Sequence, residues 1–163
     1  MVFIASYSPA LGSAASTIAW AAGVPGVMAA LFFHYIRPVP LGLLARPRPL
    51  ALATYFGCVL AELALIAAGS RALTAAHHSE LRPALIAAVV GLHFVPFAWA
   101  FHERMFLYLG VAVAAVGATG LLTGALGVPH AADALAVVAG LVMITIITLY
   151  AQGRFAPPAL KPL

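Results

Sequence analysis

Residues 105–126 read MFLYLGVAVAAVGATGLLTGAL and contain no charged side chain. A helix of this length, rising about 1.5 Å per residue, covers the ~30 Å hydrocarbon core of a bilayer. The run is too long for a strand and lacks the alternation of an outer-membrane barrel. A helix also satisfies its backbone hydrogen bonds internally, which lipid requires. The stretch therefore predicts a membrane-spanning helix.

The whole chain shares the character of this stretch. Of its 163 residues, 64% are hydrophobic and 7% are charged, and the mean hydropathy is +1.09. Soluble domains carry about 25% charged residues, enough to cover a polar surface. This composition predicts a polytopic membrane protein whose first partner is the lipid bilayer, and it speaks against nucleic-acid binding. A single cysteine, Cys58, excludes an intramolecular disulfide.

Five apolar stretches are long enough to cross the bilayer, and prolines and glycines separate them. Pro83 and Pro129 suit the first position of a helix, whereas Gly127 and Gly153 suit the position just after its end. We expect one transmembrane domain over residues 1–163, an all-α bundle of five transmembrane helices at about 12–36, 49–70, 83–101, 105–126 and 129–150.

The basic residues predict the orientation of the bundle. Only Arg71 and Arg82 fall on one side of the predicted spans. The other six fall together on the opposite side, namely Arg37, Arg46, Arg48, Arg104, Arg154 and Lys161. The positive-inside rule then places the N-terminus outside and the C-terminus in the cytoplasm. We expect a multi-pass protein of a bacterial-type inner (plasma) membrane.

Glu62 and His93 are the ionisable residues deepest in the predicted spans. Counted at 1.5 Å per residue from the cytoplasmic face, Glu62 lies about 18 Å and His93 about 13.5 Å deep. Their spans are sequential and antiparallel, so the two side chains are predicted to meet near the midplane. Such residues point to function as proton relay, catalytic acid/base or ligand contact. A pair that only locks two helices together is the alternative.

Further residues are predicted to line a small polar cavity around this pair. Tyr55 and Cys58 share the helical face of Glu62. Pro96 cannot donate the hydrogen bond that would reach the Leu92 carbonyl, which leaves a polar acceptor beside His93. Phe94 and Phe97 would cover the cavity. In the first span, the run Gly23-Val24-Pro25-Gly26 predicts a kink or loosening that would face the same central site.

The outer edge carries a second group of polar residues. Its candidate metal ligands are His77, His78, His130 and Asp133, which offer the nitrogen and oxygen atoms that zinc accepts. Their spacing matches no established metal motif, and the dipole of a helix N-terminus explains Asp133 equally well. We therefore predict no metal and no other cofactor.

Small residues predict close helix packing. Gly110, Gly117 and Gly124 recur at seven-residue steps in span 105–126, with Gly120 between them, and such stripes let helices approach closely in lipid. The stripe predicts either packing within the chain or a homo-oligomer formed through this helix.

The stretch Gly91-Leu92-His93-Phe94-Val95-Pro96-Phe97-Ala98, with Glu62 in the preceding span, resembles small uncharacterised bacterial polytopic membrane proteins. The resemblance covers about a third of the chain. It implies that His93 and Pro96 are parts of one motif. It implies no activity.

Three functions fit these observations. The first is a small-molecule binding or transport protein for a small lipophilic or polar ligand, with Glu62 or His93 carrying a proton. The second is a membrane-embedded acid/base enzyme, of isomerase or cyclase type, acting on a lipophilic substrate. The third is an accessory subunit of a membrane complex. We favour the first.

Overall fold

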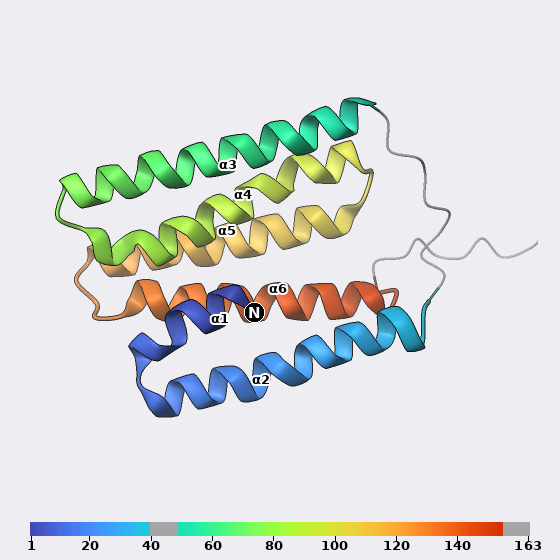
Figure 1. Cartoon of the computed structure of the whole chain (residues 1–163), viewed down its shortest axis with the longest axis horizontal. Coiled ribbons are helices and arrows are strands. Elements are labelled where there is room, and N and C mark those ends of the chain that lie inside the picture. Colours follow the sequence, from blue (N-terminus) through green and yellow to red (C-terminus); the bar gives the residue numbers. More distant parts are fainter. Residues whose placement is uncertain (40–48, 155–163) are drawn as a thin grey trace, which may run out of the picture.

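The computed structural model describes residues 1–39 and 49–154, and all regular structure in these ranges is helical (Figure 1). The α-helices are α1 (Val2–Tyr7), α2 (Ser13–Leu31), α3 (Pro49–Ala75), α4 (Arg82–Ala100), α5 (Arg104–Ala125) and α6 (Ala131–Ala151). Shorter segments are the 3₁₀ turns η1 (Ser8–Leu11) and η3 (Ser79–Leu81) and the π-helical turn η2 (Phe32–Ile36). The predicted all-α class is confirmed.

Five helical segments are long and apolar enough to span a membrane. They cover residues 13–36, 49–75, 79–100, 104–125 and 131–151, and the shortest of them contains 21 residues. At 1.5 Å per residue even that one rises about 31 Å, the thickness of the hydrocarbon core. The chain is therefore built as a multi-pass membrane protein with the five spans that the sequence predicts.

Two helix boundaries differ from the predicted ones. α3 continues past Ser70 to Ala75, so that Arg71 lies within the helix. An arginine near the end of a span is tolerated because its long stem carries the charge to the headgroups. α6 begins at Ala131 instead of Pro129, because His130 has φ 57 and belongs to the preceding turn.

The predicted glycine stops are confirmed. Gly127 and Gly153 follow the ends of α5 and α6 and have φ 83 and φ 77. These left-handed conformations carry little steric penalty in glycine, which explains why the helices end there.

The N-terminal helix α1 was not predicted. It packs into the groove between α2 and α6, where Ile4 is fully buried. The close approach depends on glycines, since a methyl group placed on Gly23 would stand 2.7 Å from Ile4 Cδ1 and one on Gly140 would stand 3.0 Å from Phe3 Cβ. A 3.0 Å contact between the Ser8 and Ser16 hydroxyls also ties η1 to α2.

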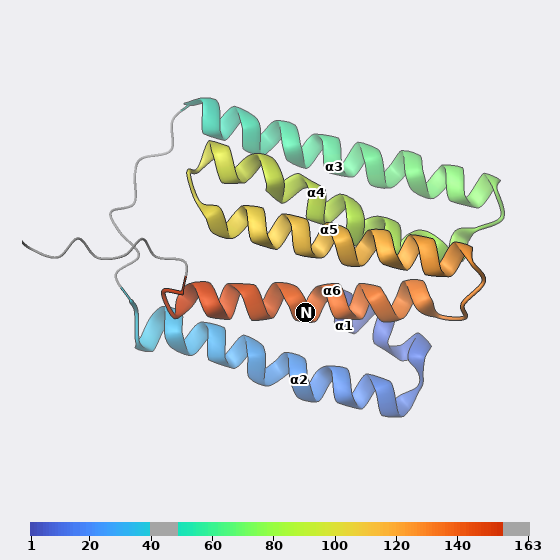
Figure 2. The same cartoon turned by 180° about the vertical axis from the view of Figure 1, so that it is seen from behind.

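The long helices lie roughly side by side in the spatial order α3, α4, α5, α6, α2 (Figures 1 and 2). α4, α5 and α6 contact one another and form the centre, whereas α3 packs against α4 and α2 against α6. α2 and α3 are thus the two flanks. Only 11% of the most apolar stretch of α2 and 6% of that of α3 is buried within the protein.

The closest helix pair, α4 and α5, is held by glycine and alanine. A methyl group on Gly91 would overlap the backbone of Ala114, and one on Gly117 would overlap the backbone of Ala88. A methyl group on Gly110 would stand 2.8 Å from the Gly91 carbonyl oxygen. The glycine stripe of α5 is therefore covered within the chain, in agreement with the first of its two interpretations.

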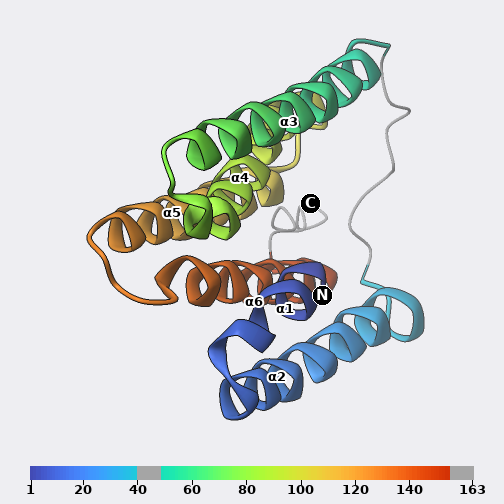
Figure 3. The ribbon, with the colours of Figure 1, turned by 60° about the vertical axis from the view of Figure 1, so that its left-hand side comes forward.

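The two ends of the bundle differ in charge. α2, α4 and α6 end, and α3 and α5 begin, at one end of the molecule (Figure 3). We call it the basic end, defined by Arg37, Arg104 and Arg154. The opposite end carries His77, His78, Glu80, Arg82, His130 and Asp133. Arg46, Arg48 and Lys161 lie outside the described residues.

Candidate functional site

Glu62 is placed by the single stripe through which α3 contacts α4. Partly buried residues recur along α3 every three or four positions, as expected of one helical face. The stripe includes Thr54, Cys58, Glu62, Ile66 and Gly69. A methyl group on Gly69 would stand 2.6 Å from Leu85 Cδ2 of α4, which shows how closely the helices approach there. Glu62 is the central residue of the 27-residue helix.

Glu62 meets His93 across this interface. Glu62 Oε2 lies 3.1 Å from His93 Nδ1, and the side chains are 17% and 13% exposed. The predicted contact is confirmed, while the role of the pair stays a prediction. Both residues are central in their spans, so each ionisable group lies far from the bulk water that would otherwise solvate it.

The contact between the carboxylate and the imidazole is short but is not an aligned hydrogen bond. His93 Nδ1 is buried and has no hydrogen-bond partner within the described part of the chain, although the carboxylate oxygen is 3.1 Å away. The N–H···O geometry between the imidazole and the carboxylate is too bent for a hydrogen bond, and hydrogen bonds weaken steeply as they bend. The imidazole also interacts with the backbone of Val90, three residues earlier in α4. The pair is therefore close, but no hydrogen bond joins its two members.

An aromatic cluster covers the pair on the side of the basic end. The His93 ring lies tilted against Phe94 at 4.2 Å and meets Phe97 edge-on at 5.2 Å, and Tyr55 of α3 stacks on Phe97 at 5.6 Å. The structure thus brings Phe94 and Phe97 against His93, and Tyr55 against Phe97, while their role in lining a polar cavity stays a prediction. Edge-to-face and offset-stacked arrangements of this kind add stability beyond the buried area.

Two further rings, of Phe101 and Phe106, join this cluster, and the sequence did not predict a place in it for Phe106. Phe106 of α5 stacks on Phe94 at 6.2 Å and meets Phe97 at 5.7 Å, and Phe101 meets Phe97 at 5.5 Å. Phe101 lies four residues after Phe97, a spacing that places both on one helical face. Phe106 reaches the cluster only because α5 packs against α4, so its sequence neighbourhood gave no signal.

The other predicted lining residues are arranged differently. The Leu92 side chain is 57% exposed and points away from the pair, so that only its carbonyl remains a candidate. Cys58 is half-buried in the α3 stripe, four residues before Glu62, and stays a candidate by position alone. Pro96 lies one turn beyond His93 and borders a pocket toward the basic end.

This pocket lies between α3 and α4 near the basic end, and neither Glu62 nor His93 lines it. Its volume is about 260 Å³, and its walls come from the start of α3 and the end of α4. They are Leu50, Ala51, Thr54, Pro96, Trp99, Ala100 and His102. Thr54 shares the stripe of Glu62, and Pro96 lies one turn beyond His93 on α4.

The predicted joint site with span one does not form. α2 runs through Pro25 as one α-helix and packs against α6, on the opposite flank from α3 (Figure 1). Gly26 serves this packing, because a methyl group on it would stand 2.7 Å from Ile144 Cγ2. The Thr148 hydroxyl donates to the Gly26 carbonyl at 3.3 Å. The glycine–proline run therefore shapes the α2–α6 contact.

The histidines of the opposite end form two separate pairs. His78 Nδ1 lies 3.0 Å from Glu80 Oε1, and His130 Nδ1 lies 3.9 Å from Asp133 Oδ2. Within residues 1–39 and 49–154, no three His, Cys, Asp or Glu side chains are grouped to hold a metal ion. The candidate ligands His77, His78, His130 and Asp133 are thus not brought into one group.

The two pairs border a common pocket of about 390 Å³, which Glu80, His130 and Asp133 line. Asp133 also acts on Tyr7 of α1. Burial raises the pKa of the Tyr7 phenol above its usual value, and the Asp133 carboxylate raises it further. The α1 turn is thereby linked electrostatically to the start of α6.

Comparisons with protein-family models, curated proteins and solved structures gave no match. The resemblance carried by the stretch around His93 therefore stays a prediction. Because folds host many functions, the function is argued from the site itself.

Proposed function

We propose that this protein binds a small molecule beside Glu62 and His93, and that one of these two groups carries a proton during binding or transport. The observation that carries the proposal is the 3.1 Å contact between two ionisable groups at the centre of α3 and α4. A charged side chain at the centre of a span costs about 2.5 kcal/mol or more on insertion scales. Such a cost is retained where the charge serves a function.

The unsaturated geometry supports this function over a structural lock. A pair kept only to fix two helices would be expected to form aligned hydrogen bonds. His93 Nδ1 instead lacks one. α3 also has apolar contacts with α4, such as Gly69 against Leu85, that fix the helix without the pair. A ligand that forms a hydrogen bond with His93 Nδ1, or a proton that binds there, would gain the free energy of an interaction that the unliganded protein lacks.

The surroundings indicate the chemistry of the ligand. The Glu62 carboxylate accepts hydrogen bonds or a positive charge, while the faces of Tyr55 and Phe94 favour an apolar body or a cation. A small lipophilic molecule with one basic or hydrogen-bonding group fits both demands. The pocket beside Pro96 offers such a ligand, or a proton, an approach from the basic end.

A membrane-embedded acid/base enzyme is the second candidate. The favouring observation is that α3 packs only on α4 among the long helices, which leaves the pair at a flank of the bundle. A lipophilic substrate would approach sideways from the lipid. Glu62 would then act as acid or base with His93 as its partner, or the reverse, as positioned groups do in isomerases and cyclases.

An accessory subunit of a membrane complex is the third candidate. It draws support from the same flank, because only 6% of the most apolar stretch of α3 is buried within the chain. A helix of another protein would cover that surface. Lipid covers it equally well, since lipid tails are as apolar as leucine.

The proposed orientation has the basic end in the cytoplasm and the N-terminus outside, in a bacterial-type inner membrane. Arg37, Arg104 and Arg154 support it, because cytoplasmic edges carry an excess of Lys and Arg. The pocket beside Pro96 would then open toward the cytoplasm.

A binding measurement with ethidium, a fluorescent lipophilic cation, tests the proposal. Purified wild type in detergent is expected to bind it, and Glu62→Gln is expected to bind it at least about tenfold more weakly, because the charged acceptor is gone. Glu103→Gln, which removes a carboxylate at the basic end, is the matched control and should bind normally. Equal binding by wild type and Glu62→Gln would reject the site.

A further inference from the structure

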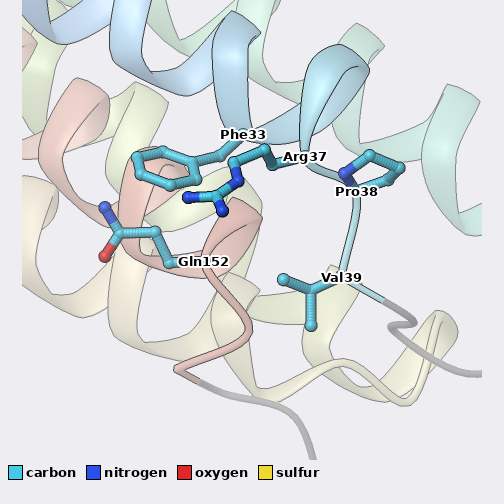
Figure 4. Close-up of a pocket in the computed structure, with 5 residues that line it drawn as sticks. All are labelled: Phe33, Arg37, Pro38, Val39 and Gln152. Carbon is cyan, nitrogen blue, oxygen red and sulfur yellow. The ribbon is translucent and has the colours of Figure 1, made fainter.

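The chain leaves its regular helix at the end of α2. The Arg37 N–H donates to the Phe32 carbonyl at 3.0 Å, five residues back, which makes Phe32–Ile36 a π-helical turn. Such turns are rare, and they are frequent at functional sites because they re-aim side chains. Here the turn places Phe33 and Arg37 side by side, facing the end of α6 (Figure 4).

A pocket of about 440 Å³ lies at this turn (Figure 4). Phe33, Arg37, Pro38 and Val39 line it from one side, and Gln152, just after α6, lines it from the other. The guanidinium group and the Gln152 amide border the same space (Figure 4). The turn after α6 closely approaches the pocket wall, because a methyl group on Gly153 would stand 2.9 Å from Val39 Cγ1.

An apolar groove adjoins this pocket and shares Phe33 with it. Its volume is about 580 Å³, and it runs back along α2. It is lined by Met28, Ala29, Leu31, Phe32, Phe33, Tyr35 and Ile36. A guanidinium and an amide at one end of an apolar groove match a molecule with an anionic head and a hydrocarbon tail.

Within residues 1–39 and 49–154, the charge of Arg37 has no acidic partner. The four acidic residues of the chain are Glu62, Glu80, Glu103 and Asp133, and none of them lines the pocket or the groove. Among the described residues no carboxylate forms an ion pair with Arg37. Arg104 and Arg154 add further positive charge at the same end, and Glu103 is the one carboxylate there among the described residues.

The depth of Arg37 fits a lipid headgroup. The span that precedes it contains 24 residues, which rise about 36 Å, slightly more than the ~30 Å hydrocarbon core. Arg37 therefore lies in the headgroup layer when α2 crosses the bilayer. Its planar guanidinium matches two phosphate oxygens at once, which lysine does not.

We propose that the pocket at the π-helical turn binds the phosphate of an anionic phospholipid, with an acyl chain along the adjoining groove. Arg37 holds the phosphate as a bidentate donor, and the Gln152 amide donates a further hydrogen bond. The groove selects a lipid over a soluble phosphate, because only a lipid covers the apolar wall next to the charge. The site lies on the flank opposite Glu62 and is independent of the function proposed for that pair.

Lipid retention tests this proposal. The full chain is purified in detergent and offered equal amounts of phosphatidylglycerol and phosphatidylcholine, and bound lipid is counted by native mass spectrometry. Wild type is expected to retain phosphatidylglycerol preferentially. Arg37→Gln is expected to lose this preference by about tenfold, whereas Arg104→Gln, at the same end but outside the pocket, should keep it. Circular dichroism confirms that each variant is folded.

Two further arms separate a lipid from a free anion. Inorganic phosphate should not displace the bound lipid, and Phe33→Ala should weaken lipid retention because the groove loses its shared wall. Displacement by inorganic phosphate, or equal retention by Arg37→Gln and wild type, would overturn the proposal.

Discussion

Glu62 Oε2 of α3 lies 3.1 Å from His93 Nδ1 of α4, yet the imidazole nitrogen has no aligned hydrogen bond within the described residues. This combination is unusual for a pair whose only task is to hold helices, because buried polar groups are nearly always satisfied. The contact therefore brings the two groups close together without a hydrogen bond between them. The variants below separate these two properties from the packing of α3.

Glu62→Gln and Glu62→Ala distinguish function from structure. Glutamine keeps the shape and removes the charge, and an interhelical hydrogen bond in a membrane is worth only about 0.6 kcal/mol on average. We therefore expect Glu62→Gln to unfold within a few degrees of wild type while it loses ethidium binding. The thermal unfolding midpoint in detergent checks this. Misfolding of both variants would show that the pair is needed for the fold.

Gly91 and Gly57 form a matched pair of glycines. A methyl group on Gly91 would overlap the Ala114 backbone, whereas Gly57 has no atom within 4 Å of such a methyl. Overpacking costs about 1–3 kcal/mol, so Gly91→Ala should lower the unfolding midpoint by several degrees. Gly57→Ala should leave it unchanged or raise it, because alanine favours the helix. An unchanged midpoint for Gly91→Ala would contradict the close α4–α5 contact.

The sequence predicted most of the bundle because its signals are local. Span length and apolar composition identify five helices, and the depths of Glu62 and His93 follow from counting residues along two antiparallel neighbours. α1 was missed because its apolar run, Val2–Leu11, is too short to count as a span. Ile4 is buried only because α2 and α6 supply glycines opposite it.

The order of the helices in the bundle could not be predicted, because it depends on contacts between residues far apart in the sequence. Pro25 and Glu62 were expected to share a central site, but α2 packs on α6 and α3 on α4. Which helices become neighbours depends on the fit of small residues, such as Gly26 against Ile144, and one sequence does not reveal such partners. Phe106 joins the aromatic cluster through the α4–α5 contact and was missed accordingly.

Ile4→Ala tests whether α1 stabilises the bundle. Ile4 is fully buried between α2 and α6, and Ile→Ala changes in cores cost about 2–5 kcal/mol. We expect a lower unfolding midpoint and faster proteolysis of the N-terminal segment. Val2→Ala is the control, because Val2 is 79% exposed and should tolerate the change. Equal midpoints for the two variants would show that α1 adds little to stability.

Cysteine accessibility separates a transport route from a site open only to lipid. Thr54 and Ile66 flank Glu62 on the α3 stripe, and Thr54 lines the pocket near the basic end. In a Cys58→Ala background, single cysteines at these positions are labelled in sealed vesicles with a charged methanethiosulfonate reagent. The reagent needs water and a thiolate, so a cysteine at Leu60, which is 68% exposed on the lipid side, should label slowly and serves as the control.

A transporter requires water to reach the pair from both ends. Thr54→Cys should then be labelled from the basic end and Ile66→Cys from the opposite end, and ethidium should slow both reactions. The enzyme alternative predicts labelling at Thr54 alone or at neither position, because its substrate arrives through lipid. Labelling of Thr54→Cys alone would therefore reject transport across the bilayer. It would remain consistent with ligand binding at Glu62.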